Sequence, residues 1–302
     1  MEKLDRLGWA AGLAFTAYGR RIGVRVNRPE ALDQVVQRLP FGWRPAPSPL
    51  VDRLYSILVG TPNPSETIRR LNLVYAGSAP LARTRDLGDA LEAFESHLHL
   101  SVAAEARGRL FVHAGVVGWR GRAILIPGRT LTGKSRLVAA LVRAGATYYS
   151  DEYAVLDAAA RVHPYARSLS IRENGGGRAL RVPVETLGGA AGTRPLPVGM
   201  VLVTRYRPGA RWRPIRLSPG QATLALLAET PAARTRPAAA LRGLRRVADR
   251  AVTLKGVRGE ADESAALILQ ACDRNERASR FAARPGGAEP IRRRIRRCGI
   301  TC

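Results

Sequence analysis

The segment from Gly128 to Ser135 carries the clearest chemical pattern in the sequence. It reads Gly-Arg-Thr-Leu-Thr-Gly-Lys-Ser and matches the phosphate-loop pattern G-x-x-x-x-G-K-[ST] without a gap. The glycines let the backbone curl so that N–H groups point at phosphate oxygens, and the helix N-terminus that follows adds partial positive charge. Lys134 would reach the β- and γ-phosphates, and the Ser135 hydroxyl would ligate Mg²⁺. We therefore predict that ATP and Mg²⁺ bind at Gly128, Arg129, Thr130, Leu131, Thr132, Gly133, Lys134, Ser135 and Arg136.

Chance is a poor explanation of this match. The sequence holds three lysines, at positions 3, 134 and 255, and Lys134 stands where the pattern requires one. At this chain's own residue frequencies, the pattern would arise by chance in on the order of a few chains per thousand. A glycine-bounded turn is the alternative interpretation. The apolar strand before the segment and the amphipathic helix after it favour the phosphate loop.

Two neighbouring acids and one histidine are the next candidates. Asp151 and Glu152 follow a short strand-like segment, where carboxylates could hold Mg²⁺ or accept a proton from an attacking hydroxyl. A solvated acidic turn is the alternative. His113 lies in an apolar run, where a histidine is more often a core residue, but it could also bind a phosphate or orient an acid. The candidate catalytic residues are Asp151, His113 and Lys134, and the candidate metal ligands are Ser135, Asp151 and Glu152.

These residues need a strand, a loop, a helix and a second strand to position them. The apolar segments 110–117 and 122–127 predict two strands joined by a tight turn. A helix is expected from Lys134, with apolar pairs at i, i+4 spacing and Gly145 as its C-cap glycine. The strand 147–150 then leads into the acids. If this strand runs parallel to 122–127, the two carboxyl ends meet at one sheet edge, where ligands of open α/β sheets bind.

The whole chain is expected to comprise two folded parts and a tail. Residues 1–105 predict a small N-terminal α/β region with a strand pair over 14–26, a short helix over 29–38 capped by Asn27, strands at 54–59 and 71–75, and a helix at 87–106. Residues 106–283 predict the P-loop catalytic domain, with later strands at 199–204 and 251–254 and helices at 219–229, 234–250 and 262–272. Residues 284–302 predict a flexible basic tail.

Composition excludes several classes of protein. The 302 residues are 46% hydrophobic, as in globular chains, and no stretch reaches the roughly 18 apolar residues of a membrane span. No signal-peptide pattern opens the chain, so we expect a cytoplasmic protein without a membrane partner. The three cysteines (Cys272, Cys298 and Cys302) form neither a disulfide framework nor a metal-ligand spacing.

Basic residues strongly outnumber acidic ones. The formal net charge is +25, and 46 of the 49 basic residues are arginine, a bias that reflects genome composition more often than function. The run Arg292–Arg297 would suit a nucleic acid, but no recognised nucleic-acid motif accompanies it. We therefore do not expect a nucleic-acid partner.

Several of these segments together resemble a known family. The segment His113-Ala114-Gly115, the phosphate loop and the segment Gly145 to Glu152 occur in the order and close spacing of HPr kinase/phosphorylase catalytic domains. They resemble more closely the HPr-kinase-like serine kinases of bacterial peptide-modification clusters, some of which phosphorylate ribosomal precursor peptides, including lasso-peptide precursors. The resemblance covers roughly residues 110–272. It implies the P-loop fold shared with phosphoenolpyruvate carboxykinase, an α/β sheet of mixed direction.

The resemblance also implies roles for single residues. Lys134 and Ser135 match the family's phosphate lysine and magnesium-side hydroxyl, and Asp151 matches the general base toward the acceptor serine. Glu152 stands where the family has a second Asp, and His113 matches a family histidine. In Leu169-Ser170-Ile171-Arg172, Ser170 replaces an acid that can face magnesium, which argues against strict HPr specificity and against the reverse, phosphorolytic activity.

The sequence therefore predicts an ATP-dependent serine or threonine kinase. Its partners would be ATP, an acceptor peptide or small protein, and a second copy of the chain in a homo-oligomer. One alternative is a nucleotide-binding regulator without transferase activity, which the substitution at Ser170 favours. The other is a nucleic-acid-binding protein that uses the arginine-rich tail.

Overall fold

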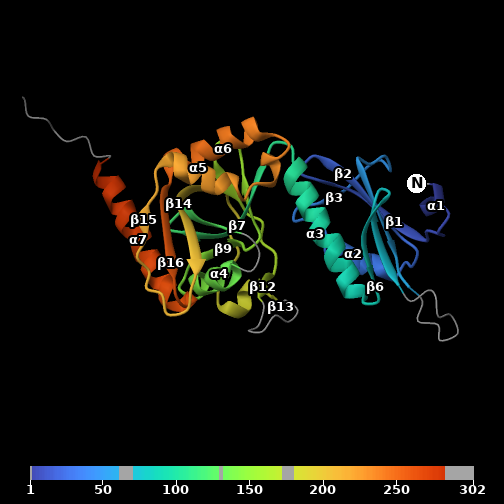
Figure 1. Cartoon of the computed structure of the whole chain (residues 1–302), viewed down its shortest axis with the longest axis horizontal. Coiled ribbons are helices and arrows are strands. Elements are labelled where there is room, and N and C mark those ends of the chain that lie inside the picture. Colours follow the sequence, from blue (N-terminus) through green and yellow to red (C-terminus); the bar gives the residue numbers. More distant parts are fainter. Residues whose placement is uncertain (1, 61–70, 129–131, 172–179, 283–302) are drawn as a thin grey trace, which may run out of the picture.

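Two large β-sheets, joined through one long helix, form most of the folded chain (Figure 1). The computed structural model describes residues 2–60, 71–128, 132–171 and 180–282. Three of the predicted site residues, Arg129, Thr130 and Leu131, lie outside these ranges. Arg172, Cys298, Cys302 and the predicted tail 284–302 also lie outside them.

The first sheet has six strands in the order β3-β1-β2-β4-β5-β6. All neighbouring pairs are antiparallel except β2 and β4, which run parallel. Its strands are β1 (Ala11–Ala17), β2 (Arg20–Val26), β3 (Arg44–Pro45), β4 (Arg53–Leu58), β5 (Asn72–Ala76) and β6 (Ala79–Thr84). The helices of this part are α1 (Glu2–Asp5), α2 (Ala31–Val36) and α3 (Leu87–Glu105).

Helix α3 covers the first sheet with an apolar stripe. Leu91, Phe94, Leu98 and Val102 recur at helical spacing and pack against sheet residues such as Tyr55 and Val74. The Asp86 side chain caps the helix by accepting a hydrogen bond from the Asp89 N–H. The Arg236 guanidinium donates to the carbonyls of Ala104 and Ala106 at its other end, so the second part of the molecule satisfies carbonyls at the C-terminus of this helix.

The second sheet has eight strands of mixed direction, and most follow the order β11-β10-β7-β8-β14-β16-β15. The three strands β8, β14 and β16 are parallel. The strands are β7 (Leu110–Trp119), β8 (Arg122–Pro127), β9 (Thr147–Ser150), β10 (Tyr153–Leu156), β11 (Arg161–His163), β14 (Leu196–Tyr206), β15 (Ile215–Arg216) and β16 (Val252–Arg258). A separate pair is formed by β12 (Leu169–Ile171) and β13 (Leu180–Val182).

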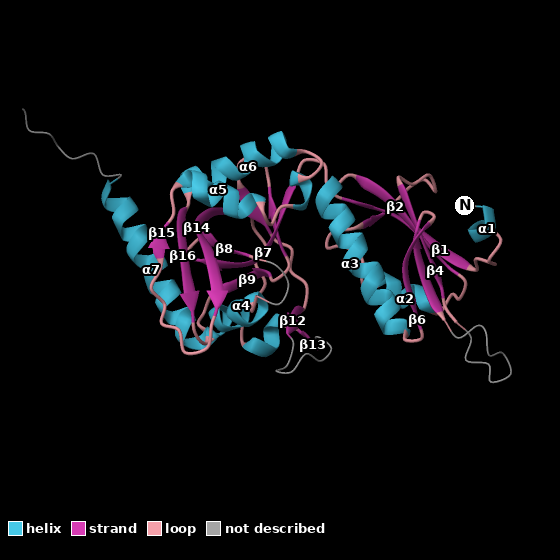
Figure 2. Ribbon diagram, in the orientation of Figure 1, coloured by secondary structure: helices cyan, strands magenta, loops and turns pink. Residues whose placement is uncertain are grey.

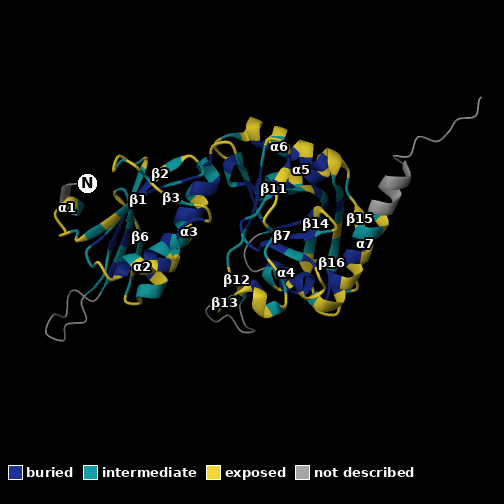
Figure 3. Cartoon of the chain, turned by 180° about the vertical axis from the view of Figure 1, so that it is seen from behind, coloured by how far each residue is buried: buried dark blue, intermediate teal, exposed yellow. Residues whose placement is uncertain are grey.

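Helices cover both faces of the second sheet (Figure 2). They are α4 (Lys134–Arg143), α5 (Pro219–Leu227), α6 (Pro237–Arg250) and α7 (Ala261–Ala282), with short 3₁₀ segments η1 (Val184–Leu187) and η2 (Pro231–Ala233). Alternate residues of β8 face opposite sides: Ile124 and Ile126 pack with α4 and α7, whereas Ala123 and Leu125 pack with α5 and α6. Figure 3 shows strands such as β7 and β14 buried beneath the exposed outer faces of α5 and α6. The predicted α/β class with a sheet of mixed direction is confirmed.

Strand β7 determines where the predicted site residues meet. One edge of β7 pairs with β8, and its other edge pairs with β10 in its first half and with β9 in its second half, all antiparallel. The strands β8 and β9 therefore run in the same direction, which is the condition stated above for a shared sheet edge, but β7 lies between them. Their carboxyl ends, at Pro127 and Ser150, lie opposite Ala114 and Val116 of β7. The loop and the acids consequently emerge at the same edge of the sheet.

The predicted helix after the loop forms as expected. Gly145 has a φ of +98°, and its N–H donates to the Val142 carbonyl while the N–H of Ala146 donates to the Leu141 carbonyl, which is the Schellman ending of α4.

In the first part of the chain, the predicted N-cap of α2 is wrong. The N-cap is Glu30, and the Asn27 side chain hydrogen-bonds the backbone of Val59 instead. Within the described ranges, no helix is long and apolar enough to cross a bilayer.

Candidate active site

The phosphate loop leads directly into α4. Gly133 is the N-cap of this helix and has a left-handed φ of +78°, a conformation that favours glycine. Its carbonyl accepts hydrogen bonds from the Leu137 N–H and from the Arg258 guanidinium. Because Arg258 ends β16 and is 2% exposed, it fixes the helix start to the carboxyl edge of the parallel strands. The first backbone N–H groups of α4 are thus available to an anion at this edge.

Lys134 is buried at the start of α4, with 7% of its surface exposed. Burial lowers the pKa of its ammonium group to about 8, although the nearby charges of Glu229 and Asp151 oppose this shift. The lysine is therefore in a poorly hydrated position and within the electrostatic influence of two carboxylates. A triphosphate entering here would provide the anion that favours the charged ammonium.

Ser135 and Asp151 are in direct contact. The Ser135 hydroxyl donates to Asp151 Oδ2 at 2.8 Å, and the backbone N–H of Ser170 donates to the same oxygen at 2.9 Å. The Tyr148 hydroxyl lies 3.0 Å from Asp151 Oδ1. Burial raises the pKa of Asp151, and the three hydrogen bonds only partly offset this effect. Asp151 is therefore an oriented carboxylate with more proton affinity than an exposed aspartate.

Glu152 points away from Ser135, toward α3. Its carboxylate lies 3.4 Å from His99 Nδ1 and 3.4 Å from Nη1 of Arg167. Burial raises the pKa of Glu152, but the contact with His99 and the charge of Arg167 outweigh it, so the pKa falls below its usual range. The acid pair is thus divided: Asp151 faces the phosphate loop, whereas Glu152 faces a basic cluster.

His113 contributes to the site through its backbone and lies beside it through its ring. Its carbonyl accepts from the Gly128 N–H, and its own N–H donates to the Glu229 carbonyl. The ring packs 5.5 Å from that of Tyr153, and no described side chain hydrogen-bonds it. Burial, and then the charge of Lys134, lower the pKa of His113 to about 4. The imidazole is therefore neutral at pH 7, and the predicted contact with Asp151 is not among those the structure forms.

The residues of the site fit a magnesium nucleotide. Mg²⁺ takes octahedral oxygen ligands at about 2.1 Å, so adjacent ligands stand about 3 Å apart, and it usually keeps several waters. Ser135 Oγ and Asp151 Oδ2 are oxygens at this separation, and Lys134 and the start of α4 lie next to them. Among the described residues, no group of three or more His, Cys, Asp or Glu side chains is arranged to hold a metal.

The structure brings together most of the predicted site and adds residues that sequence reasoning missed. Gly128, Thr132, Gly133, Lys134, Ser135 and Asp151 gather at one edge, whereas the Arg136 side chain is exposed. The additions are Glu229, Arg258, His99, Arg167 and Tyr148. The sequence indicates such residues only indirectly. For example, Glu95 and His99 stand at i, i+4 spacing beside the apolar stripe of α3, which places them on one face of that helix.

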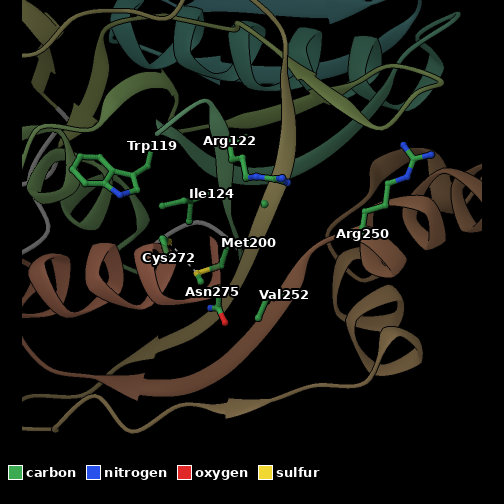
Figure 4. A pocket seen from close by; sticks show the side chains of 10 residues that line it. Trp119, Arg122, Ile124, Met200, Arg250, Val252, Cys272 and Asn275 are labelled. Atoms are coloured by element: carbon green, nitrogen blue, oxygen red, sulfur yellow. Dashed lines mark hydrogen bonds between the residues drawn. The ribbon is translucent and has the colours of Figure 1, made fainter. Parts of the chain in front are cut away.

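A separate cavity lies at the opposite edge of the second sheet (Figure 4). It is lined at the starts of β8, β14 and β16 and by α7, with apolar walls such as Ile124 and Met200 and with Arg122 and Arg250 among its polar groups. Cys272 also lines it, and burial raises the pKa of this thiol to about 12. None of the predicted site residues lines this cavity.

Comparisons with known proteins give limited matches. No family model matches the chain, and no curated protein matches it. A solved structure that it resembles in part is the HPr(Ser) kinase/phosphatase from Coxiella burnetii, with 15% sequence identity and a TM-score of 0.32 over 57% of this chain and 98% of that chain. A likeness of this size leaves the function of the site to be argued from its own residues.

Proposed function

We propose that this chain is an ATP-dependent phosphotransferase that moves the γ-phosphoryl group to a serine or threonine hydroxyl of a peptide or small protein. The observation that carries the proposal is the 2.8 Å hydrogen bond between Ser135 and Asp151 beside the buried Lys134. A hydroxyl, a carboxylate and an ammonium group meet where a phosphate loop opens into a helix. Phosphoryl transfer needs these groups, because its catalysis is mostly positioning and charge neutralisation.

Asp151 is suited to receive the proton of the acceptor hydroxyl. Burial raises its pKa, which makes it a better base, and Tyr148 and the Ser170 N–H fix its orientation. As the hydroxyl oxygen forms its bond to the γ-phosphorus, the bond from phosphorus to the β,γ-bridging oxygen breaks. The hydroxyl proton passes to the Asp151 carboxylate, and ADP leaves with the bridging oxygen.

The remaining groups neutralise and orient the phosphates. Lys134 supplies a positive charge in a poorly hydrated position, where it acts more strongly than in water. The N–H groups at the start of α4 bind phosphate oxygens. Mg²⁺ held by Ser135 and Asp151 would supply further charge neutralisation when bound. Arg258, behind Gly133, keeps the helix start in place.

The experiment measures binding and transfer separately. Calorimetry with MgATP reports binding, and transfer of ³²P from [γ-³²P]ATP to an array of short peptides, each with one serine or threonine, reports activity. Asp151→Asn should bind MgATP within a fewfold of the unmodified chain but transfer about 10²- to 10⁴-fold more slowly, the range of a lost general base. Lys134→Ala should weaken both.

The control is Asp249→Asn on α6, an exposed acid-to-amide change that should alter neither quantity. Absence of heat with MgATP would overturn the proposal. Binding without transfer to any peptide would favour the alternative function, a nucleotide-dependent regulator, and full transfer by Asp151→Asn would remove the assigned base.

A further inference from the structure

Helix α3 packs on the first sheet (Figure 1), yet two of its side chains connect to Glu152, one directly and one through Arg167. They are Glu95 and His99, four residues apart and therefore on one face of the helix. His99 is 2% exposed, and its Nδ1 lies 3.4 Å from the Glu152 carboxylate. Its Nε2 donates to the Arg38 carbonyl at 3.0 Å, because a carbonyl can only accept. The imidazole is therefore fixed through Nε2, with Nδ1 facing Glu152.

Arg167 links Glu95 to Glu152. Its Nη2 donates to Glu95 Oε1 at 2.6 Å, while its Nη1 lies 3.4 Å from Glu152 and 3.1 Å from His99 Nδ1. Arg181 of β13 also binds Glu95, and Arg38 Nε lies 3.7 Å from it. A single carboxylate of α3 thus holds guanidinium groups from three separate parts of the chain. Because their side chains are half-buried or better, these pairs are screened less than surface ion pairs.

The segment that carries Arg167 also contacts Asp151. The Arg167 carbonyl accepts from the Tyr148 hydroxyl, which also lies against Asp151, and the Ser170 N–H donates to Asp151 directly. The same segment begins at Tyr165, whose backbone N–H donates to the Tyr149 carbonyl and whose ring packs in the aromatic cluster between the two sheets. Residues 165–170 are therefore in contact with both acids and with α3.

We propose that Glu95, His99 and Arg167 are positioning residues for the acid pair, so that the N-terminal sheet acts on phosphoryl transfer through α3. The inference rests on the proposed function and extends it. Glu95 anchors Arg167, and Arg167 and His99 together hold Glu152 apart from Asp151. Without these contacts, residues 165–170 would lose a constraint that keeps the Ser170 N–H and Tyr148 on Asp151. A docked N-terminal sheet would then be a condition for full activity.

A purely structural role predicts a different result. Partners that orient ligating or catalytic side chains typically affect metal affinity or rate by about 10- to 100-fold, whereas a role in adhesion between the two sheets would lower stability alone. We therefore expect Glu95→Gln to lower kcat for transfer about tenfold or more and to change the Kd for MgATP less than threefold. The Mn²⁺ concentration that half-saturates the site, measured by EPR in the presence of a non-hydrolysable ATP analogue, should increase.

Two further variants separate charge from geometry. Arg167→Lys keeps the positive charge but loses the planar fork that reaches Glu95 and Glu152 together, so it should behave like Glu95→Gln. Glu95→Asp should recover part of kcat. Asp89→Asn, an exposed acid-to-amide change on the first turn of α3, is the matched control and should leave kcat and metal binding unchanged, with a loss of stability of at most about 1 kcal/mol from the helix N-terminus.

Hydrogen exchange tests the coupling without any transfer activity. Peptides that cover 148–152 and 165–171 should exchange faster in Glu95→Gln than in Asp89→Asn, while peptides of α5 and α6 should not change. If the unmodified chain transfers no phosphate, the proposed function fails but this readout still applies. The inference is overturned if exchange and kcat are unaffected in Glu95→Gln and Arg167→Lys. It is also overturned if both variants lose stability across the whole chain in proportion to activity.

Discussion

Arg258 and Gly133 join the last strand of the second sheet to the start of the phosphate-loop helix. The Arg258 Nη2 donates to the Gly133 carbonyl at 2.9 Å, and a Cβ placed on Gly133 would come within 2.6 Å of that nitrogen. The glycine therefore serves two purposes, since it permits the left-handed backbone and leaves room for the guanidinium. Two segments 125 residues apart in the sequence form one phosphate-binding edge.

Replacing Arg258 should weaken the helix start. Arg258→Met keeps an apolar stem of similar length but removes a charged hydrogen bond, which typically contributes about 1.5–3 kcal/mol. We expect a loss of unfolding free energy in this range and roughly tenfold weaker MgATP binding, equivalent to about 1.4 kcal/mol. Urea denaturation and calorimetry measure the two. Arg245→Met on α6, where the side chain is 79% exposed, controls for loss of charge alone.

Nucleotide binding should take up a proton at alkaline pH. Burial lowers the pKa of Lys134 to about 8, so in the nucleotide-free protein the Lys134 amine is mostly neutral at pH 9. A bound triphosphate would favour the charged ammonium form. We expect close to one proton taken up at pH 9 and almost none at pH 7, measured by calorimetry in buffers of different ionisation enthalpy. In Lys134→Arg the uptake should vanish, because arginine stays charged. Equal uptake at both pH values in the unmodified chain would contradict this assignment.

Gly115 should tolerate no methyl group. A Cβ at Gly115 on β7 would lie 2.6 Å from the Val138 side chain of α4, inside a packed core. Gly115→Ala should therefore cost about 1–3 kcal/mol of unfolding free energy, the usual range for overpacking, and should weaken MgATP binding because α4 carries Lys134. Denaturant titration checks the first effect. The double variant Gly115→Ala/Val138→Ala should recover part of the loss. Gly220→Ala in α5 should cost nothing, because a Cβ there would meet no atom within 4 Å apart from its chain neighbours and the backbone of its own helix.

The His113 ring should titrate far below the ordinary range. Burial and the charge of Lys134 lower its pKa to about 4, from the 6.5 that is ordinary for a histidine. Between these values the unfolded chain binds a proton that the folded chain does not, so this residue makes unfolding more favourable as pH falls. NMR of the imidazole Cε1–H should give a midpoint near 4, and in His113→Gln the fall in stability between pH 6.5 and 4 should be smaller. A midpoint near 6.5 would show that the ring is solvated.

Local chemistry explains which parts of the fold could be predicted. Gly133 and Gly145 bound α4 through conformations that glycine favours, and both lie within a few residues of the apolar pattern that predicts the helix. The loop strand, the helix and the acids follow one another within 31 residues, from Arg122 to Glu152, so their order and spacing are visible in the sequence. The common direction of β8 and β9 entered the sequence analysis only as a condition, and the structure meets it through β7, which pairs antiparallel with both strands.

Distant partners explain which parts could not. Asparagine is a residue type that favours N-cap positions, but the Asn27 amide hydrogen-bonds the backbone of Val59, 32 residues away. This long-range contact replaces the local capping bond that the sequence predicts. In the sequence, His99 is indistinguishable from the other buried residues of α3. It contacts Glu152, 53 residues later in the chain, only because the two parts of the molecule pack together. The catalytic role of His113 stays a prediction, as do the roles of Arg129, Thr130 and Leu131, which lie outside the described ranges.

The position of β7 has a consequence for engineering. Adjacent residues of this strand bond the two halves of the site on opposite edges: the His113 carbonyl accepts from Gly128, and the Ala114 N–H donates to the Glu152 carbonyl. The separation of loop and acids is therefore the width of one strand. To transplant this catalytic spacing into another scaffold, a designer would need an internal strand with both neighbours antiparallel, and the length of the connecting helix would be free to vary.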